Sequence, residues 1–364
     1  MKPETIRDRV TLSGGDRELE SGYAAALMKN TLALRLIIKA FYAGMVCDKR
    51  LLLIGASLFC FLSACTDSAK MSAPLFELKN FVFIHGGEFT MGSPDGEVGR
   101  DDAKASYQED GVKYSETQHQ VKLSNFYIGK YAVTVAEFRR FVEATGYQTD
   151  AEKEGFSVIF TNGEVKKGEG LNWRDGVSGS WWYPWRRWFR LEENHPVLHV
   201  SWNDAVAYCK WLSAKTGKHF RLSTEAEREY ACRAGTTTPF NTGKNLTTDQ
   251  ANYDGDYPYN NNQKGVYRQN TVAVNSFAPN AWGLYNMHAN VLEWCSDWYG
   301  ETYYDDCKAK GVVENPAGPE TGSKRVLRGG GWNYIAEYCR SAYRDSGTPD
   351  FRNSYVGFRL VFVP

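Results

Sequence analysis

Apolar residues recur along the chain at two spacings, and each spacing predicts a different kind of element. Residues 81–84 form a short apolar run before the turn-forming residues 85–87, and residues 126–128 form another, as is typical of β-strands. Segments 134–145 and 201–216 repeat apolar residues every three or four positions, as in helices with one buried face. The pattern therefore predicts a mixed α+β chain.

A hydroxyl residue followed three positions later by an acid marks three helix starts, at Thr134, Ser201 and Thr224. Such a pair bonds the free N–H groups of a first helical turn. The helices are expected to end near three glycines: Gly146, Gly217 and Gly235. Beyond residue 235 we expect only short strands and turns. With neither repeats nor an internal linker, residues 77–364 are interpreted as one domain.

The N-terminal part contains the pattern of an export signal. Lys49 and Arg50 precede an apolar run over residues 51–62, and Leu62-Ser63-Ala64 stands directly before Cys65. A charged start, a short apolar stretch and small residues are the parts of a secretory signal. The alternative is a short transmembrane helix, but spanning a bilayer takes about 20 apolar residues. The segment resembles the lipobox of bacterial lipoproteins, which implies diacylglycerol on Cys65 and display from the cell envelope at the outer surface.

The export signal divides the chain into four regions. Residues 1–44 do not fit a signal peptide, and we interpret them as an over-extended start before Met45 or as an unusually long charged region. Residues 45–65 are the expected signal peptide, and the small, polar residues 66–76 are the expected tether. The folded domain follows.

Composition excludes some classes of protein. The 43 basic and 43 acidic residues cancel, so the chain lacks the basic field expected of a nucleic-acid partner. Eight cysteines are too few for a disulfide scaffold of this length. Five follow Cys65, and this odd number leaves at least one unpaired: Cys209, Cys232, Cys295, Cys307 and Cys339.

A series of motifs runs through the domain in a fixed order. They are GGEFTMGS at 86–93, NHPVLHVSW at 194–202, RLSTEAE at 221–227, NAWGLYNM at 280–287, RGG at 328–330 and GFR at 357–359. Together they resemble the formylglycine-generating enzyme (sulfatase-modifying factor) family over nearly all of residues 80–362. The resemblance implies a C-type-lectin-like α+β fold with little regular secondary structure. It leaves function open, because the family contains oxidases, iron-dependent sulfoxide synthases and non-catalytic binders.

The enzyme activities of this family require residues that the chain lacks. The oxidases use two cysteines spaced C-x4-C, and the resemblance places these positions at about Ala336 and Ser341. Cys339 has no near partner, and we expect it to pack as a small apolar residue or to pair with a distant cysteine. The synthases need a histidine-rich iron site. His195 and His199 flank a proline that disfavours a helix, so we interpret both as structural.

Calcium is the metal that the resemblance favours. Family members hold Ca²⁺ with asparagine side chains and backbone carbonyls, which are hard oxygen ligands. Asn286, the Ala289 carbonyl and Asn290 match one such site. The alternative is that these asparagines cap turns. No cofactor is otherwise expected to be required.

One irregular segment, over about residues 331–358, carries the functional prediction. Long irregular stretches within compact domains are usually functional or disordered, and the apolar, glycine-rich flanks argue against disorder. Its composition is that of a binding surface, in which tyrosines give large contacts and small polar residues adapt. The ten candidate ligand-binding residues are Tyr334, Ile335, Tyr338, Tyr343, Asp345, Ser346, Gly347, Phe351, Ser354 and Tyr355.

These ten residues share a property at the level of codons. Each can be reached from the asparagine codon AAC by changing adenines alone, whereas intervening residues such as Trp332, Glu337 and Arg340 would stay fixed. The pattern resembles the variable region of proteins diversified by a retroelement, in which adenines are mutated while a template is copied. The alternative is ordinary family variation, with some of the tyrosines in the core.

The sequence thus predicts a monomeric, non-catalytic surface lipoprotein that binds a protein or another cell-surface molecule. The alternatives are an exported enzyme of the same family and an inert structural protein of the envelope. An aromatic and basic cluster at residues 181–190 is expected to be a rim of the binding site, an insert packed on the core or a membrane-contacting patch.

Overall fold

Three helices begin where the capping motifs predict. They are α3 (Val135–Thr145), α5 (Trp202–Thr216) and α6 (Glu225–Arg233). Each follows a hydroxyl residue whose side chain accepts the backbone N–H of the third helical residue, and the acid at that position bonds back. The first two end at left-handed glycines, Gly146 and Gly217. The third ends at Ala234, one residue before the expected glycine, with φ +46°.

This computed structural model describes residues 78–100, 115–161, 163–177 and 192–363. The chain divides into two compact units, residues 1–73 and 74–364, and all of the described residues belong to the second. The expected lipidation site at Cys65 and the cluster at residues 181–190 lie outside the described residues. Within the described ranges, no helix has the length and apolar character needed to cross a membrane.

One sheet joins the two ends of the domain. Its strand order is β1-β4-β13-β7, and all of its described pairings are antiparallel. The strands are β1 (Phe81–Ile84), β4 (Phe126–Gly129), β13 (Leu360–Phe362) and β7 (Phe220–Leu222). The first two are the strands that the apolar runs predict.

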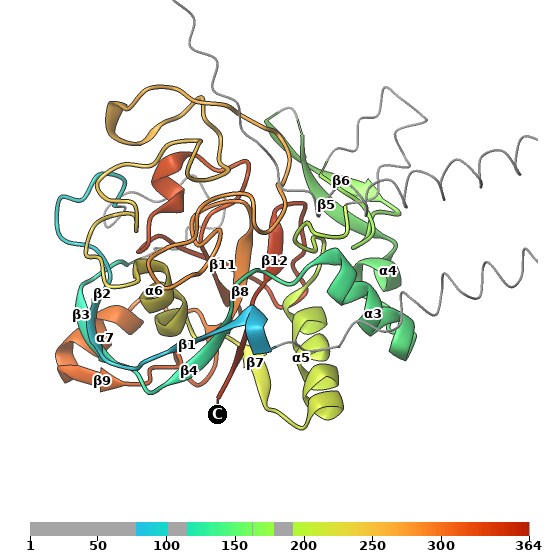
Figure 1. The fold of residues 1–364 in the computed structure, drawn as a ribbon, viewed down its shortest axis with the longest axis horizontal. Helices are drawn as coiled ribbons and strands as arrows, with labels where there is room; N and C mark the ends of the chain where they lie inside the picture. Colours follow the sequence, from blue (N-terminus) through green and yellow to red (C-terminus); the bar gives the residue numbers. More distant parts are fainter. Residues whose placement is uncertain (1–77, 101–114, 162, 178–191, 364) are drawn as a thin grey trace, which may run out of the picture. The chain divides into compact units, whose positions relative to one another are not determined.

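A second sheet lies at the centre of the view in Figure 1 and supports the candidate site. Its strand order is β11-β10-β8-β12, with β12 parallel to β8 and the other neighbours antiparallel. The strands are β11 (Arg344–Gly347), β10 (Arg325–Arg328), β8 (Leu292–Trp298) and β12 (Val356–Phe358).

Smaller elements complete the described part of the domain. They are η1 (Leu78–Asn80), β2 (Glu88–Met91), β3 (His119–Lys122), α4 (Asp150–Glu154), β5 (Phe156–Thr161), β6 (Glu164–Glu169), η3 (Tyr259–Asn261), α7 (Tyr303–Lys310), β9 (Val312–Glu314) and η4 (Ala336–Cys339). The pattern analysis missed α7, because only Tyr304 and Cys307 of its eight residues are buried. Two buried positions give too little periodicity to predict a helix.

The apolar run at the end of the chain, residues 356–363, does not form one strand. Residues 356–358 and 360–362 belong to different sheets, and Arg359 lies between them. Its buried guanidinium donates hydrogen bonds to Glu293 on β8 at 2.8 to 3.2 Å and to the Gly129 carbonyl on β4 at 2.9 Å. Arg359 thus links the two sheets at the point where the chain passes from one to the other.

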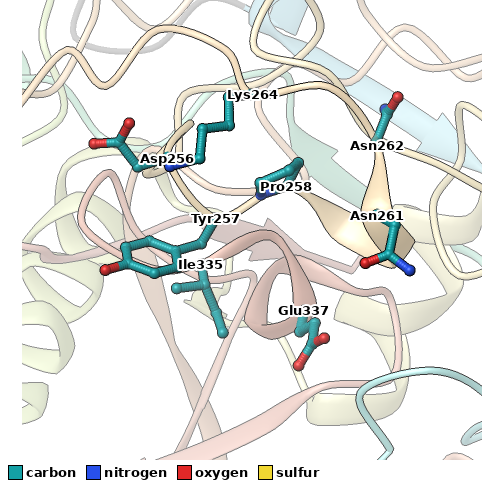
Figure 2. A pocket seen from close by; sticks show the side chains of 8 residues that line it. All are labelled: Asp256, Tyr257, Pro258, Asn261, Asn262, Lys264, Ile335 and Glu337. Carbon is teal, nitrogen blue, oxygen red and sulfur yellow. The ribbon is translucent and has the colours of Figure 1, made fainter.

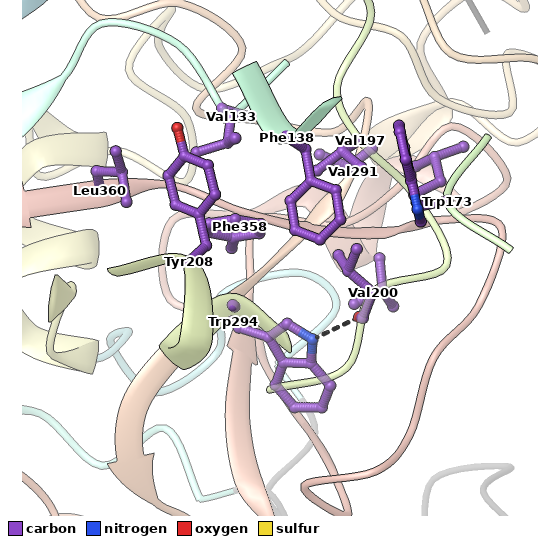
Figure 3. Close-up of a cluster of buried hydrophobic side chains, with 14 of the residues drawn as sticks. Val133, Phe138, Trp173, Val197, Val200, Tyr208, Val291, Trp294, Phe358 and Leu360 are labelled. Atoms are coloured by element: carbon purple, nitrogen blue, oxygen red, sulfur yellow. Dashed lines mark hydrogen bonds between the residues drawn. The ribbon is translucent and has the colours of Figure 1, made fainter. Parts of the chain in front are cut away.

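The largest core cluster is rich in aromatic side chains, as Figure 3 shows. Phe138 on α3 and Tyr208 on α5 pack against Phe358 on β12, with ring centroids 6.3 and 5.4 Å from the Phe358 ring. The buried Trp294 on β8 donates its indole N–H to the Val200 carbonyl at 3.1 Å. Burial of large aromatics with a satisfied polar atom makes a firm platform beneath the central sheet.

Candidate functional site

The segment over residues 331–358 alternates between partly exposed and buried positions. Seven of the ten candidate residues are partly exposed, and we call these seven the variable surface: Tyr334, Ile335, Tyr338, Tyr343, Ser346, Phe351 and Tyr355. Four of the residues between them, Ala336, Cys339, Ala342 and Arg344, are buried at no more than 1% exposure, whereas Glu337 and residues 348–350 are not buried. η4 and β11 produce this alternation, because β11 pairs with β10 in a regular antiparallel register.

Four tyrosines of the variable surface pack together, and we call them the tyrosine cluster. Tyr338 and Tyr343 stack with ring centroids 4.9 Å apart. Tyr334 lies between this pair and Tyr355, with its ring centroid 5.5 Å from that of Tyr355 and 6.1 and 6.5 Å from those of the stacked pair. The cluster joins residues that are up to 21 positions apart in the segment into one aromatic patch.

The innermost tyrosine of this cluster is held by a buried acid. The Tyr334 hydroxyl donates a hydrogen bond to Asp345 Oδ2 at 2.9 Å, and Asp345 Oδ1 accepts the Ser346 N–H at 2.7 Å. Burial, together with the nearby Asp345 carboxylate, raises the pKa of Tyr334 well above its usual value. The phenol therefore stays protonated and anchors the cluster to β11.

Three of the ten candidates face the interior: Asp345, Gly347 and Ser354. A Cβ atom added at Gly347 would come within 2.9 Å of the Phe351 ring and 3.0 Å of the Trp294 ring. Ser354 is fully buried, and its Oγ accepts the Phe160 N–H at 3.2 Å. In this structure these three residues shape and support the variable surface and offer a ligand almost no contact area.

Buried arginines hold the segment to the rest of the domain. Arg340 donates to both carboxylate oxygens of Glu116 at 2.7 Å, and Arg344 donates to both oxygens of Glu225 at 2.7 and 2.9 Å. Burial alone would raise the pKa of each carboxyl group, but the paired arginine holds the pKa of Glu116 and of Glu225 below its usual value. Such bidentate pairs fix the geometry of the backbone that carries the tyrosines.

The two positions at which the resemblance places the oxidase cysteines are buried and carry other residues. Ala336 is fully buried, and Ser341 is 4% exposed. Cys339 packs against the RGG motif, since a Cβ at Gly330 would lie 2.6 Å from its Sγ atom. All five cysteines after Cys65 are free and buried, so Cys339 packs alone. Cys232 Sγ lies 3.8 Å from Ser341 Oγ, which the linear spacing did not indicate.

The two histidines of the NHPVLHVSW motif have structural roles. His199 is fully buried, its Nδ1 lies 2.8 Å from Ser157 Oγ, and burial lowers its pKa to about 4. His195 Nδ1 lies 3.0 Å from Thr271 Oγ1. Within the ranges that the structure describes, no group of three or more His, Cys, Asp and Glu residues could hold a metal ion.

The three residues of the expected calcium site share a left-handed backbone. Asn286, Ala289 and Asn290 have φ of +50°, +63° and +67°. Asn290 Oδ1 already accepts hydrogen bonds from Asn252 Nδ2 at 3.1 Å and the Val272 N–H at 3.0 Å. Asn286 Oδ1, by contrast, is buried and has no hydrogen-bond partner. These residues fit a calcium ion only in part, and the free oxygen of Asn286 is the ligand that they would offer.

We propose that calcium, if bound here, depends on that oxygen. Millimolar Ca²⁺ is then expected to raise the melting temperature of the wild-type chain and not that of Asn286→Ala, because ligands that bind only the folded state stabilise it. Thermal unfolding with Ca²⁺ and with a chelator measures the difference. Equal curves for the wild-type chain in both buffers would leave the asparagines as turn caps.

The motif and codon patterns did not indicate a cavity that adjoins the variable surface. Its volume is about 420 Å³, and residues 256–258, 261, 262 and 264 line it together with Ile335 and Glu337 (Figure 2). Two hydrogen bonds tie this loop to the segment, from Asp254 N–H to the Tyr334 carbonyl at 2.9 Å and from Ala336 N–H to the Tyr257 carbonyl at 3.2 Å. The polar, asparagine-rich composition predicts a loop there, but nothing local indicates its partner.

The chain resembles known proteins over most of the described domain. A model of the sulfatase-modifying factor enzyme 1-like domain matches residues 67–363. The formylglycine-generating enzyme of Streptomyces coelicolor is 40% identical over 300 residues, which cover 77% of this chain and 88% of that protein. The inactive C-alpha-formylglycine-generating enzyme 2 of Mus musculus is 32% identical over 304 residues, covering 77% and 84%.

Two solved structures share the fold. PvdO from Pseudomonas aeruginosa is 30% identical with a TM-score of 0.57, and the match covers 78% of this chain and 94% of that one. Treponema denticola variable protein 1 is 24% identical with a TM-score of 0.53, covering 78% and 95%. The expected fold is thereby confirmed, and the relative named as an enzyme is more similar to this chain, at 40% identity, than the relative named as inactive, at 32%.

Proposed function

The chain belongs to the sulfatase-modifying factor enzyme 1-like family, and we propose that it is a non-catalytic binder. The family leaves this question open, since its members include named enzymes and a named inactive protein. It engages a protein or another cell-surface molecule through the variable surface. It does so as a monomer displayed from the cell envelope by a lipid on Cys65. Fatty-acid labelling of the wild-type chain but not of Cys65→Ser would test that attachment.

The observation that carries this proposal is the match between codon pattern and exposure. Seven of the ten residues that one asparagine codon can reach are partly exposed, and the other three are buried. Among the fixed residues, Trp332, Arg340 and Arg352 are 1 to 5% exposed, whereas Glu337 is partly exposed. A diversified binder needs most of its variable positions at exposed sites, because substitutions at exposed sites leave the fold intact. Aromatic side chains at the centre of such a patch supply most of the binding energy in known interfaces.

The decisive experiment reads the DNA beside the 3′ end of the gene. We expect a near-copy of codons 328–360 that differs from the gene only where the copy has adenine, together with a gene for a reverse transcriptase. If neither is found, the proposal that a retroelement diversifies this gene is wrong. The residues from Tyr334 to Tyr355 would then be explained by ordinary variation among members of the family.

The second candidate function is oxidation of a cysteine residue in a peptide. The 40% identity to a named formylglycine-generating enzyme favours it, and so does the thiol of Cys232 beside Ser341. The Cys232 thiol lies 3.6 Å from His288 Nε2, but Ser341 stands where the resemblance places a second sulfur of the family's C-x4-C pair. We therefore expect no oxidation of a cysteine-containing peptide with copper and oxygen, measured by mass spectrometry. Turnover that Cys232→Ser removes would instead establish the enzyme.

A further inference from the structure

The cavity beside the variable surface carries charged groups that the ion pairs of the described domain do not use. Asp256 and Glu337 supply carboxylates and Lys264 supplies an ammonium group, and none of the three forms an ion pair with another described residue. Lys264 acts electrostatically on Asp254, which bonds the Asp256 N–H at 3.1 Å. Glu337 forms no ion pair with a described residue, since the neighbouring Arg340 guanidinium pairs instead with Glu97 and Glu116.

The position of Glu337 is fixed from behind. Its stem packs against Gly99, where an added Cβ would lie 2.9 Å from Glu337 Cβ, and Gly99 has φ +75°. Its backbone carbonyl accepts the Arg340 Nε–H at 3.0 Å. In Figure 2 the Glu337 carboxylate lies apart from Lys264, across the cavity. A half-buried carboxylate held in this way is ready to receive a positive charge without rearrangement.

An aromatic ring stands at the same cavity. Tyr257 is 61% exposed, which is unusual for a large aromatic residue, and Ile335 and Pro258 line the wall between it and Glu337. An exposed ring attracts cations to its face, and an apolar wall suits the methylene stem of a long basic side chain. Charge, ring and wall together fit an arginine or lysine side chain.

We propose that this cavity is a fixed subsite for a basic side chain of the protein ligand. It rests on the proposed function, because it adds to the same binding surface. Glu337 is not among the ten candidate residues, whereas its neighbours Ile335 and Tyr338 are. The tyrosine cluster would then differ between variants of this protein, while the cation subsite at its edge would be common to all of them.

The test uses the full chain and two small probes. The probes are Nα-acetyl-arginine amide and its neutral analogue Nα-acetyl-citrulline amide, and saturation-transfer NMR observes their binding. We expect saturable binding of the arginine probe and not of the citrulline probe. Glu337→Gln should weaken it about threefold or more, because one partly exposed charge pair is lost. Lys264→Met should strengthen it, and Glu320→Gln, an exposed acid outside the cavity, should leave it unchanged.

Equal binding of both probes, or an arginine affinity unchanged by Glu337→Gln, would overturn the subsite. A melting curve of each variant serves as the control that the variant is folded. An Ile335→Ser variant should still bind the arginine probe, since the charge and the ring remain. Failure of the subsite is distinguishable from failure of the proposed function, because substitutions in the tyrosine cluster test the latter and should leave the arginine probe bound.

Discussion

The double substitution Tyr338→Ala and Tyr343→Ala is expected to abolish ligand capture and to lower the melting temperature by only a few degrees. The two rings stack at 4.9 Å and are partly exposed on the variable surface. Truncation of a central aromatic costs about 2 kcal/mol or more of binding free energy. Two such losses correspond to roughly a thousandfold in affinity. The stacking of the pair adds about 0.5–1.5 kcal/mol to folding beyond the burial of the two rings, which is incomplete here.

A matched pair of tyrosines outside the segment provides the control. Tyr131 and Tyr285 are also partly exposed, with ring centroids 4.9 Å apart. Their double alanine variant should lose a similar amount of stability and keep its binding. The measurement compares the amounts of each partner protein that the three full-length chains capture from extracts of neighbouring cells. If the first variant loses its fold, or if both variants bind equally well, the tyrosine cluster is core packing and not a contact surface.

Arg344→Ala is expected to cause the largest loss of stability. Arg344 pairs with the buried Glu225 through two hydrogen bonds, donates to the Ser115 carbonyl at 3.0 Å and lies 3.8 Å from the ring centre of Tyr304. Removing one partner of a buried ion pair costs about 3–5 kcal/mol, because the other charge stays buried. For a domain of this size the melting temperature should fall by about 10 °C.

The loss from Arg344→Ala should also depend on pH. In the wild-type chain, Arg344 and Arg328 overcome the effect of burial and hold the pKa of Glu225 below its usual value of 4.5. The stabilisation is therefore present above the unfolded pKa and is lost as the pH falls through the lower folded pKa. Without Arg344, burial favours the protonated acid. The difference between variant and wild type should consequently shrink when denaturant unfolding is repeated at about pH 5.

An exposed ion pair gives the control for this experiment. Arg139 pairs with Glu193 at 2.9 Å near the surface, where the Glu193 side chain is 61% exposed. Arg139→Ala should cost less than about 1 kcal/mol, since solvent screens such pairs. Equal losses in the two variants, or a loss in Arg344→Ala that grows toward acidic pH, would contradict the role given to the buried pair.

The sequence predicted well the features that depend on residues close together in the chain. The starts of α3, α5 and α6 were confirmed because a cap involves atoms only three residues apart, such as Thr134 and Glu137. The ends at Gly146 and Gly217 were confirmed because glycine readily adopts a left-handed backbone. The motifs also identified the family and hence the fold, as the family model confirms.

Contacts between distant segments were decided only by the tertiary structure. One apolar run divides into strands of two sheets at Arg359. The sequence did not predict this, because the partner of Arg359, Glu293, lies 66 residues away. The sequence singled out ten residues of the segment over residues 331–358. In the structure, Gly347 packs against Trp294 and Ser354 bonds the Phe160 N–H, so both face the interior.

The candidate site shows the same division. The sequence by itself determined which residue types gather in one segment, and it shows alanine and serine where the resemblance places the cysteine pair of the oxidases. Only the tertiary structure brought Tyr257 beside Ile335 and Glu337, and Cys232 beside Ser341. The reason is physical: caps and turns depend on backbone atoms a few residues apart, whereas cavities and exposed patches depend on which distant surfaces the packed core brings together.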